Sequence, residues 1–336
     1  MSSLWARARF IFGAVALVIL VASMAPAQAE QNAPVDPEAR VVNERTLLQQ
    51  FPRIQGDIDQ PNQRERVLIQ PAGRVWDHFH EVTLRWIGVV AILGMPALLV
   101  VAYLLIGRIR ITAGPSGRKV PRFTGFERFA HWLTAVSFVI LGLTGLNITF
   151  GKLLLRPLMG PEAFSAFSQV AKYVHNYISF SFVIGLALIV AMWLKDNIPD
   201  RTDIAWFRQG GGFIKSRHAP ARRFNAGEKL VFWGALGAGT LVTISGLLLL
   251  FPFYVTDIFG MQIAQGVHAV IAILFVAMIL AHIYIGTAGM EGAFEAMATG
   301  EVDYNWAKEH HDLWLAEQVA KRSGNRQALP APSPAE

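Results

Sequence analysis

The chain has 336 residues, of which 53% are hydrophobic and 16% are charged, and its formal net charge is +6. Ordinary globular domains carry about a quarter charged residues, so this composition favours a membrane protein. The absence of cysteine excludes thiolate-bound iron–sulfur clusters, c-type haem attachment and disulfides within the chain. The basic residues fall in loops between apolar segments, where they serve topology, and the positive charge does not indicate nucleic-acid binding.

Residues 1–29 predict a secretory signal peptide. Arg7 and Arg9 precede an apolar run, and Ala27-Gln28-Ala29 fits a small-x-small cleavage site before Glu30. An uncleaved anchor helix is the alternative, but the apolar run is short for a full span. Residues 30–83 are mostly polar and lack a clear helical or strand period, so we expect a periplasmic arm that becomes ordered against a partner.

Five apolar segments are long enough to cross a bilayer as helices. They lie at about 84–106, 129–150, 175–194, 229–251 and 267–286. Residues 107–128 form a predicted loop, and residues 291–336 form a polar tail with an amphipathic stretch through Trp306 and Trp314. The expected fold class is therefore an all-α membrane protein, with a four-helix domain over 129–290 and one extra N-terminal transmembrane helix.

Loop charges predict the orientation of these helices. Basic residues are dense in the loop 107–128 and in the loop between the third and fourth spans. They are sparse between the second and third spans and absent from Pro252 to Gly266. The positive-inside rule therefore places these two basic loops and the C-terminus in the cytoplasm. The mature N-terminus then lies in the periplasm of a bacterial inner membrane. A cleaved signal peptide agrees with this topology.

The fifth span carries His268 and His282 with only apolar residues between them. Fourteen residues at about 100° each amount to roughly four whole turns, so both rings lie on nearly one face, about 21 Å apart along the axis. His131 opens the second span and His175 opens the third. With the predicted topology, His131 and His282 lie near the cytoplasmic surface, whereas His175 and His268 lie near the periplasmic surface. Two pairs at matching depths, each from two helices, are what bis-histidine ligation of two haems requires.

Other interpretations of these histidines are weaker. A single histidine at the end of a span is often a buried residue bonded to a neighbour, but four that pair by depth are unlike that case. A proton relay would be expected to use carboxylates, which the spans almost lack. Glycines would allow a porphyrin to lie against backbone, although ordinary helix packing explains each one equally well. These glycines are Gly142, Gly145, Gly185 and Gly246.

The remaining polar candidates predict less. His78 and His80 form an H-x-H pattern that we interpret as a solvated interfacial pair, because no further metal ligand adjoins them. His218, His310 and His311 are expected at the surface. Four basic residues near the expected haem edges are interpreted as topology determinants or lipid contacts rather than propionate ligands. They are Arg128, Arg156, Lys172 and Lys229.

The stretch from about Arg122 to Glu317 resembles the cytochrome b (gamma) subunit of membrane-bound formate dehydrogenase. The loop motifs Asp196-Asn-Ile-Pro-Asp and Phe224-Asn-Ala-Gly-Glu-Lys are more specific than the histidines, because related hydrogenase cytochromes share the histidine plan. Further matching motifs are Phe129-Ala-His-Trp, Tyr173-Val-His-Asn, Val267-His-Ala, Leu280-Ala-His-Ile-Tyr and Trp306-Ala-Lys-Glu-His-His. The signal, the arm and the extra span resemble a longer form of this family.

This resemblance implies two haem b groups, one held by His131 and His282 and the other by His175 and His268. It also implies a quinone site at Asn225, Gly227 and His282. Asn225 with Glu228 alternatively reads as the capping box of a helix, and both roles are compatible. The partners implied are a periplasmic iron–sulfur (beta) subunit and a catalytic molybdenum or tungsten (alpha) subunit of formate respiration.

With these partners, the chain itself would transfer electrons and reduce quinone without oxidising formate. Two alternatives remain open. One is the cytochrome b of a nickel–iron hydrogenase or of another periplasmic oxidoreductase. The other is a haem-free membrane anchor.

Overall fold

The computed structural model describes residues 73–211 and 219–327. The predicted signal peptide, most of the predicted arm, His218 and the last residues of the tail lie outside the described residues. Within the described part, five helices are long and apolar enough to cross a membrane. Each of them contains most or all of one predicted segment and ends within a few residues of it, so the expectation of five spanning helices is confirmed for the described residues.

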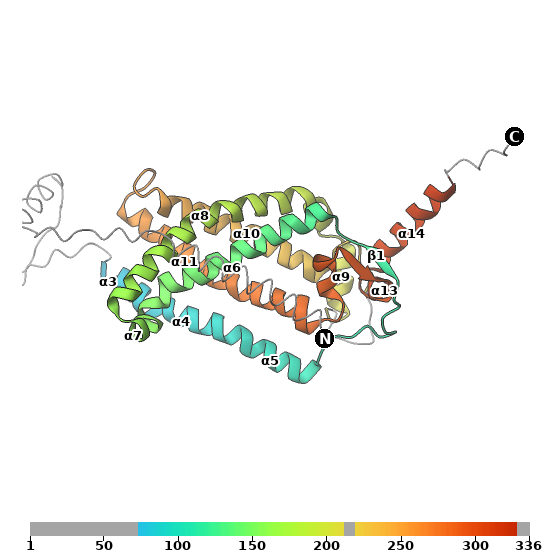
Figure 1. The fold of residues 1–336 in the computed structure, drawn as a ribbon, viewed down its shortest axis with the longest axis horizontal. Helices are drawn as coiled ribbons and strands as arrows, with labels where there is room; N and C mark the ends of the chain where they lie inside the picture. Colours follow the sequence, from blue (N-terminus) through green and yellow to red (C-terminus); the bar gives the residue numbers. More distant parts are fainter. Residues whose placement is uncertain (1–72, 212–218, 328–336) are drawn as a thin grey trace, which may run out of the picture. The chain divides into compact units, whose positions relative to one another are not determined.

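Four of these helices form a bundle (Figure 1). Helix α6 (Gly125–Leu154) packs along α8 (Pro161–Trp193), and α10 (Ala226–Leu250) packs along α11 (Ile258–Tyr284). Further contacts of α10 with α8 and of α11 with α6 close the bundle. Its centre is apolar, with Phe182 and Phe275 buried between the helices.

The extra span is a continuous helical segment with two π-helical stretches. It comprises α3 (Gly73–His78), η2 (Phe79–Thr83), α4 (Leu84–Gly88), η3 (Val89–Leu93) and α5 (Gly94–Ile106). The segment lies along α11, and Gly88 admits the ring of Phe150 so closely that a Cβ there would collide with it.

Most helices extend beyond the predicted spans. The first segment begins at Gly73 rather than near 84, and α8 begins at Pro161 rather than near 175. Hydropathy marks only the part of a helix in hydrocarbon, about 20 residues, whereas hydrogen bonding continues into the polar layers. Local chemistry sets the ends: Thr124 with Glu127 and Asn225 with Glu228 form capping boxes at the starts of α6 and α10.

Short elements connect the long helices. Between α6 and α8 lies α7 (Arg156–Met159), and after α8 follow η4 (Lys195–Asn197) and α9 (Arg201–Arg208). After α11 come η5 (Ile285–Gly289), α12 (Ala293–Ala298), β2 (Glu301–Asp303), α13 (Tyr304–His310) and α14 (Asp312–Gln327). Strand β1 (Lys119–Pro121), from the loop after α5, pairs antiparallel with β2, and Val120 lies opposite Val302.

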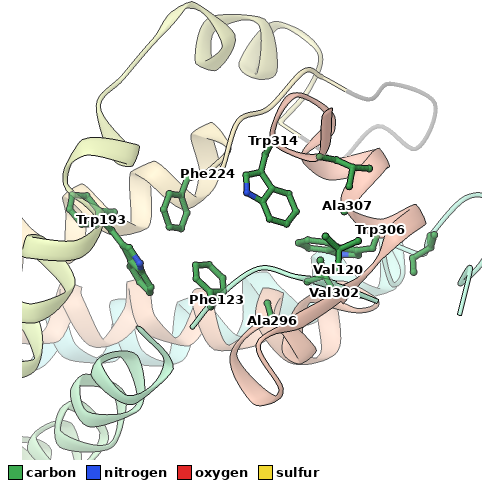
Figure 2. Packing of buried hydrophobic residues seen from close by; sticks show 12 residues of the cluster. Val120, Phe123, Trp193, Phe224, Ala296, Val302, Trp306, Ala307 and Trp314 are labelled. Atoms are coloured by element: carbon green, nitrogen blue, oxygen red, sulfur yellow. The ribbon is translucent and has the colours of Figure 1, made fainter. Parts of the chain in front are cut away.

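The described part of the tail is folded onto one end of the bundle, and Trp306 and Trp314 of the expected amphipathic stretch are buried there. Figure 2 shows a buried cluster in which Trp306 and Trp314 from the tail meet Phe123, Trp193 and Phe224. The apolar residues of the tail are widely spaced, so its polar average hides a buried face that forms only against the loop and bundle.

Candidate cofactor sites

His131 and His282 face each other across the bundle. His131 lies in the second turn of α6 and His282 lies near the end of α11. Their ring centres are 6.2 Å apart and the ring planes are inclined by 59°. The structure thus places these two predicted residues side by side, although they are far apart in sequence.

His175 and His268 form a second pair with similar geometry. His175 projects from α8 and His268 from α11, with ring centres 6.2 Å apart and planes inclined by 68°. Because α11 supplies one member of each pair, the separation of the pairs is the separation of His268 and His282 along one helix. Fourteen residues at about 1.5 Å each amount to about 21 Å.

The spacing within each pair fits an iron atom between two imidazole nitrogens. A bond from a first-row metal to a histidine nitrogen is about 2.0–2.1 Å, and each nitrogen lies roughly 1 Å from its ring centre, so an in-line pair separates the centres by about 6 Å. The observed separation of 6.2 Å in both pairs agrees with this value. The donor set of neutral imidazoles also suits haem iron.

Glycines allow the His175–His268 pair to approach the neighbouring helices. A Cβ at Gly145 would stand 3.3 Å from Cε1 of His175, and one at Gly246 would stand 3.1 Å from Cε1 of His268. Gly185 instead contacts Thr134 on α6, and Gly142 is in ordinary contact distance of Val276. Of the four predicted glycines, two therefore adjoin the histidines and two serve helix packing.

Two hydroxyl groups that were not predicted from the sequence adjoin the same histidines. Thr144 Oγ1 lies 2.9 Å from Nδ1 of His175, and Ser245 Oγ lies 3.1 Å from Nδ1 of His268. By contrast, Nδ1 of His131 is buried and has no hydrogen-bond partner within the described residues. The available signal was a hydroxyl residue directly before a glycine in a span, as in Thr144-Gly145 and Ser245-Gly246.

The predicted quinone residues lie where α10 begins. The side-chain oxygen of Asn225 accepts from the N–H of Glu228 at 3.0 Å, and the Asn225 N–H donates to the Glu228 carboxylate at 2.8 Å. Gly227 lies under the indole of Trp206 from α9. Because α10 and α11 are antiparallel neighbours, the start of α10 and His282 lie at the same end of the bundle, although Asn225 bonds to Glu228 and not to His282.

Charged groups are buried at this end of the bundle. Arg122 donates to Glu228 at 3.1 Å and to the carbonyl of Arg223 at 2.8 Å, and its guanidinium lies over Trp306 and Trp314. Burial lowers the pKa of Arg122, while the Glu228 carboxylate counteracts that effect. The contacts of Arg122 thus join the loop before α6, the start of α10 and the tail.

The expectation that His311 lies at the surface is wrong. Its exposed fraction is 0%, and its Nδ1 donates to the carbonyl of Arg222 at 2.9 Å. Burial lowers the pKa of His311 well below its usual value, and the nearby Arg122 lowers it further, so the ring is neutral at pH 7. His310 is half-buried and its ring packs against Trp306.

Two predicted topology determinants also have structural roles. Lys229 is buried and donates to Asp203 at 2.9 Å and to the carbonyl of Ile198 at 3.1 Å, which holds α9 against α10. Arg128 donates to the carbonyls of Met297 and Ala298 at the end of α12. Hydropathy and charge patterns cannot show such partners because they lie far away in sequence.

The H-x-H pair lies at the start of the first helical segment. His78 is exposed, and Nδ1 of His80 lies 3.4 Å from the carboxylate of Glu81. Among the described residues, no group of three or more His, Cys, Asp or Glu side chains is arranged to hold a metal ion. The interfacial pair stays a prediction for these two histidines.

A membrane bundle with two cross-helix histidine pairs defines the class of membrane cytochromes b. Residues 122–300 match the family described as prokaryotic cytochrome b561, and since this is more than half of the chain, the protein belongs to that family. It is therefore a multi-pass membrane protein that carries haem b.

Named relatives cover the same region. The chain is 25% identical over 207 residues to the nitrate-inducible formate dehydrogenase cytochrome b556(Fdn) subunit of Escherichia coli K12. The matched region covers 60% of this chain and 92% of the relative. The chain is 27% identical over 202 residues to the formate dehydrogenase cytochrome b556(fdo) subunit of the same strain, covering 59% and 92%. A formate dehydrogenase cytochrome b556 subunit of Haemophilus influenzae is 25% identical over 202 residues, covering 58% and 82%.

Proposed function

We propose that this chain is the cytochrome b subunit of a formate dehydrogenase, which anchors the complex and carries electrons across the membrane to quinone. The observation that carries the proposal is the presence of two histidine pairs, each with ring centres 6.2 Å apart, at two levels of one bundle. The named relatives support formate as the ultimate donor. In this proposal the chain does not itself oxidise formate.

Two haem b groups would be held by the two pairs. His131 and His282 would be the axial ligands of one iron, and His175 and His268 those of the other. When bound, each haem supplies a one-electron carrier. The helices keep the paired rings in position before binding, because each histidine projects from a long transmembrane helix rather than from a loop.

The loop charges support an orientation with the His175–His268 pair near the periplasm and the His131–His282 pair near the cytoplasm. A periplasmic iron–sulfur subunit, itself bound to a molybdenum or tungsten catalytic subunit, would then deliver electrons at the His175–His268 end. Inward movement of an electron against a negative interior costs about 2.3 kcal/mol per 100 mV for a full crossing. Electron transfer in this direction therefore stores energy as membrane potential.

The quinone would bind at the cytoplasmic end, beside Asn225, Gly227 and His282. A quinone carbonyl needs hydrogen-bond donors, and the first N–H groups of α10 together with the amide group of Asn225 are such donors. The side-chain oxygen of Asn225 is used for the cap, which leaves its amide NH2 group for a ligand. One residue can therefore begin the helix and contact the substrate.

Haem spectroscopy on the complex purified from native membranes tests the electron-transfer role. We expect a dithionite-reduced b-type spectrum and co-purification of a molybdenum or tungsten subunit. A nickel–iron subunit would instead favour the hydrogenase alternative, and the lack of any haem signal would support a haem-free anchor. His175→Ala should remove one of two haems and leave the other; retention of both would contradict the ligand assignment.

The quinone site needs a variant that leaves the helix cap intact. Asn225→Asp keeps a capping oxygen but removes the amide donors, so we expect slower quinone reduction with normal haem content and normal haem reduction by formate. Asn225→Ala removes both functions and also costs about 1 kcal/mol of helix stability. Unchanged quinol formation in Asn225→Asp would refute the assignment.

A further inference from the structure

Each histidine of the His175–His268 pair is bonded to a hydroxyl group on a different helix. Thr144 on α6 lies 2.9 Å from Nδ1 of His175, and Ser245 on α10 lies 3.1 Å from Nδ1 of His268. Both hydroxyls come directly before the glycine on which the same imidazole rests, Gly145 or Gly246. The arrangement occurs twice, once on α6 and once on α10.

The direction of these hydrogen bonds follows from the other partner of each hydroxyl. Thr144 Oγ1 donates its only proton to the carbonyl of Ile140 at 2.8 Å, and Ser245 Oγ donates to the carbonyl of Leu241 at 2.6 Å. A hydroxyl whose proton is already used can only accept from the imidazole. Nδ1 therefore carries the proton in both rings, and Nε2 has the free lone pair that a metal requires.

We propose that Thr144 and Ser245 are positioning residues that fix His175 and His268 as Nε2 ligands and lower the reduction potential of the haem between them. The proposal rests on the haem ligation proposed above. A histidine whose second nitrogen donates a hydrogen bond is a stronger electron donor, and such bonds are an established means of tuning a bound metal. Stronger donation stabilises the oxidised iron and so lowers its potential.

In the His131–His282 pair, at least one histidine lacks such a hydrogen bond. Nδ1 of His131 is buried without a hydrogen-bond partner within the described part of the chain. The two sites therefore differ in the hydrogen bonding of their ligands although their ring geometry is alike. A lower potential at the His175–His268 end makes electron movement towards the His131–His282 end favourable, which helps it to proceed against the membrane potential.

The proposal is tested by variants that remove each hydroxyl group and otherwise keep the side chain similar in size. Thr144→Val and Ser245→Ala should each raise the midpoint potential of the haem held between His175 and His268. The double variant should raise this potential further. The potential of the other haem should stay unchanged. Haem content should stay normal, because neither substitution removes one of the paired histidines.

Redox titration of haem absorbance and the ferric low-spin resonance spectrum are the measurements. Thr144→Ser keeps the hydroxyl and should behave as wild type. Thr149→Val and Thr243→Val are matched controls, because these threonines donate to a carbonyl on the same two helices but bond to no histidine in the described structure. Their titrations should not change.

Three results would overturn the proposal. The first is an unchanged potential in both Thr144→Val and Ser245→Ala. The second is an equal shift in the Thr149→Val control. The third is loss of haem in both Thr144→Val and Thr144→Ser, because Thr144→Ser keeps the hydroxyl group and its loss of haem would indicate a packing role alone. Failure of the ligation itself is distinguishable, because His175→Ala would then retain both haems.

Discussion

The indole of Trp206 lies directly against Gly227, so that a Cβ at residue 227 would stand 3.0 Å from Cη2 of the ring. The ion pair of Lys229 with Asp203 holds α9, which carries Trp206, at the start of α10. Trp206 therefore forms a wall beside the proposed quinone contacts, on a helix whose Ile204 and Phe207 remain exposed.

Gly227→Ala should impair quinone reduction while haem content and haem reduction stay normal, because the added methyl group displaces Trp206 and narrows access to the N–H groups of α10. Steady-state quinone reduction by the purified complex measures this. Gly237→Ala is the matched control on the same helix, since Gly237 has open space around it and should tolerate alanine. Equal activity of the two variants would argue against a quinone at Gly227.

Gly246→Ala should weaken haem binding at the His175–His268 pair. The new Cβ would stand 3.1 Å from Cε1 of His268, which forces the ring away from its position; overpacking of this kind costs about 1–3 kcal/mol. Haem-to-protein ratio and the reduced spectrum are the measurements. Gly142→Ala, which only meets a Val276 methyl group at 3.6 Å, should keep both haems. Full haem content in Gly246→Ala would show that the ring is free to adjust.

Lys229→Met should destabilise the protein by about 3–5 kcal/mol, because it leaves the carboxylate of Asp203 buried without its cation. Thermal unfolding in detergent measures the loss. The double variant Lys229→Met with Asp203→Asn should recover much of the stability, since neither charge then remains. Lys172→Met, at an exposed position on α8, should have little effect. If the single and double variants are equally unstable, the ion pair is not the cause.

Because of Asp303, the stability of the folded tail should decrease as the pH falls into the acid range. Its carboxylate accepts from the backbone of Ser116, Gly117 and Asn305 at 2.8–3.1 Å. Burial raises its pKa, but these hydrogen bonds outweigh burial and hold the pKa below its usual value. Because the folded pKa is depressed, the stabilisation is complete above the unfolded value of about 3.9 and declines as the pH falls towards the folded value.

Comparison with Asp303→Asn isolates this effect from other carboxylates. Thermal unfolding should show wild type more stable than the variant at pH 7, with the difference shrinking below about pH 4. A difference that is constant from pH 7 to pH 3 would contradict the role of the carboxylate charge.

Hydropathy and residue spacing predicted the five helices and the partners of all four paired histidines. The prediction worked because a membrane leaves few choices: a spanning segment must satisfy its backbone internally, and its depth follows from its ends. His268 and His282 could be placed on one face from their spacing alone, and His131 and His175 could be matched to them by depth. The observed ring contacts agree with that pairing.

The same reasoning could not place residues whose environment depends on distant parts of the chain. His311 was predicted to lie at the surface of a polar tail, yet the tail folds over Arg122 and His311 is buried there. Lys229 looked like a topology determinant, yet it pairs with Asp203 on α9. In both cases a polar side chain is buried with a partner from another element, and local pattern carries no signal for such a contact.

Within the part of the chain that the structure describes, the sequence by itself determined the number and approximate position of the spanning helices, the identity of the paired histidines and their assignment to two depths, because all of these depend on local hydropathy and helical periodicity. Only the tertiary structure decided the 6.2 Å separation of the rings, the hydroxyls of Thr144 and Ser245 beside one pair, and the folding of the tail over the other end. These features arise where different helices meet, and the distance and direction of side chains across such an interface are set by packing rather than by the order of residues along either helix.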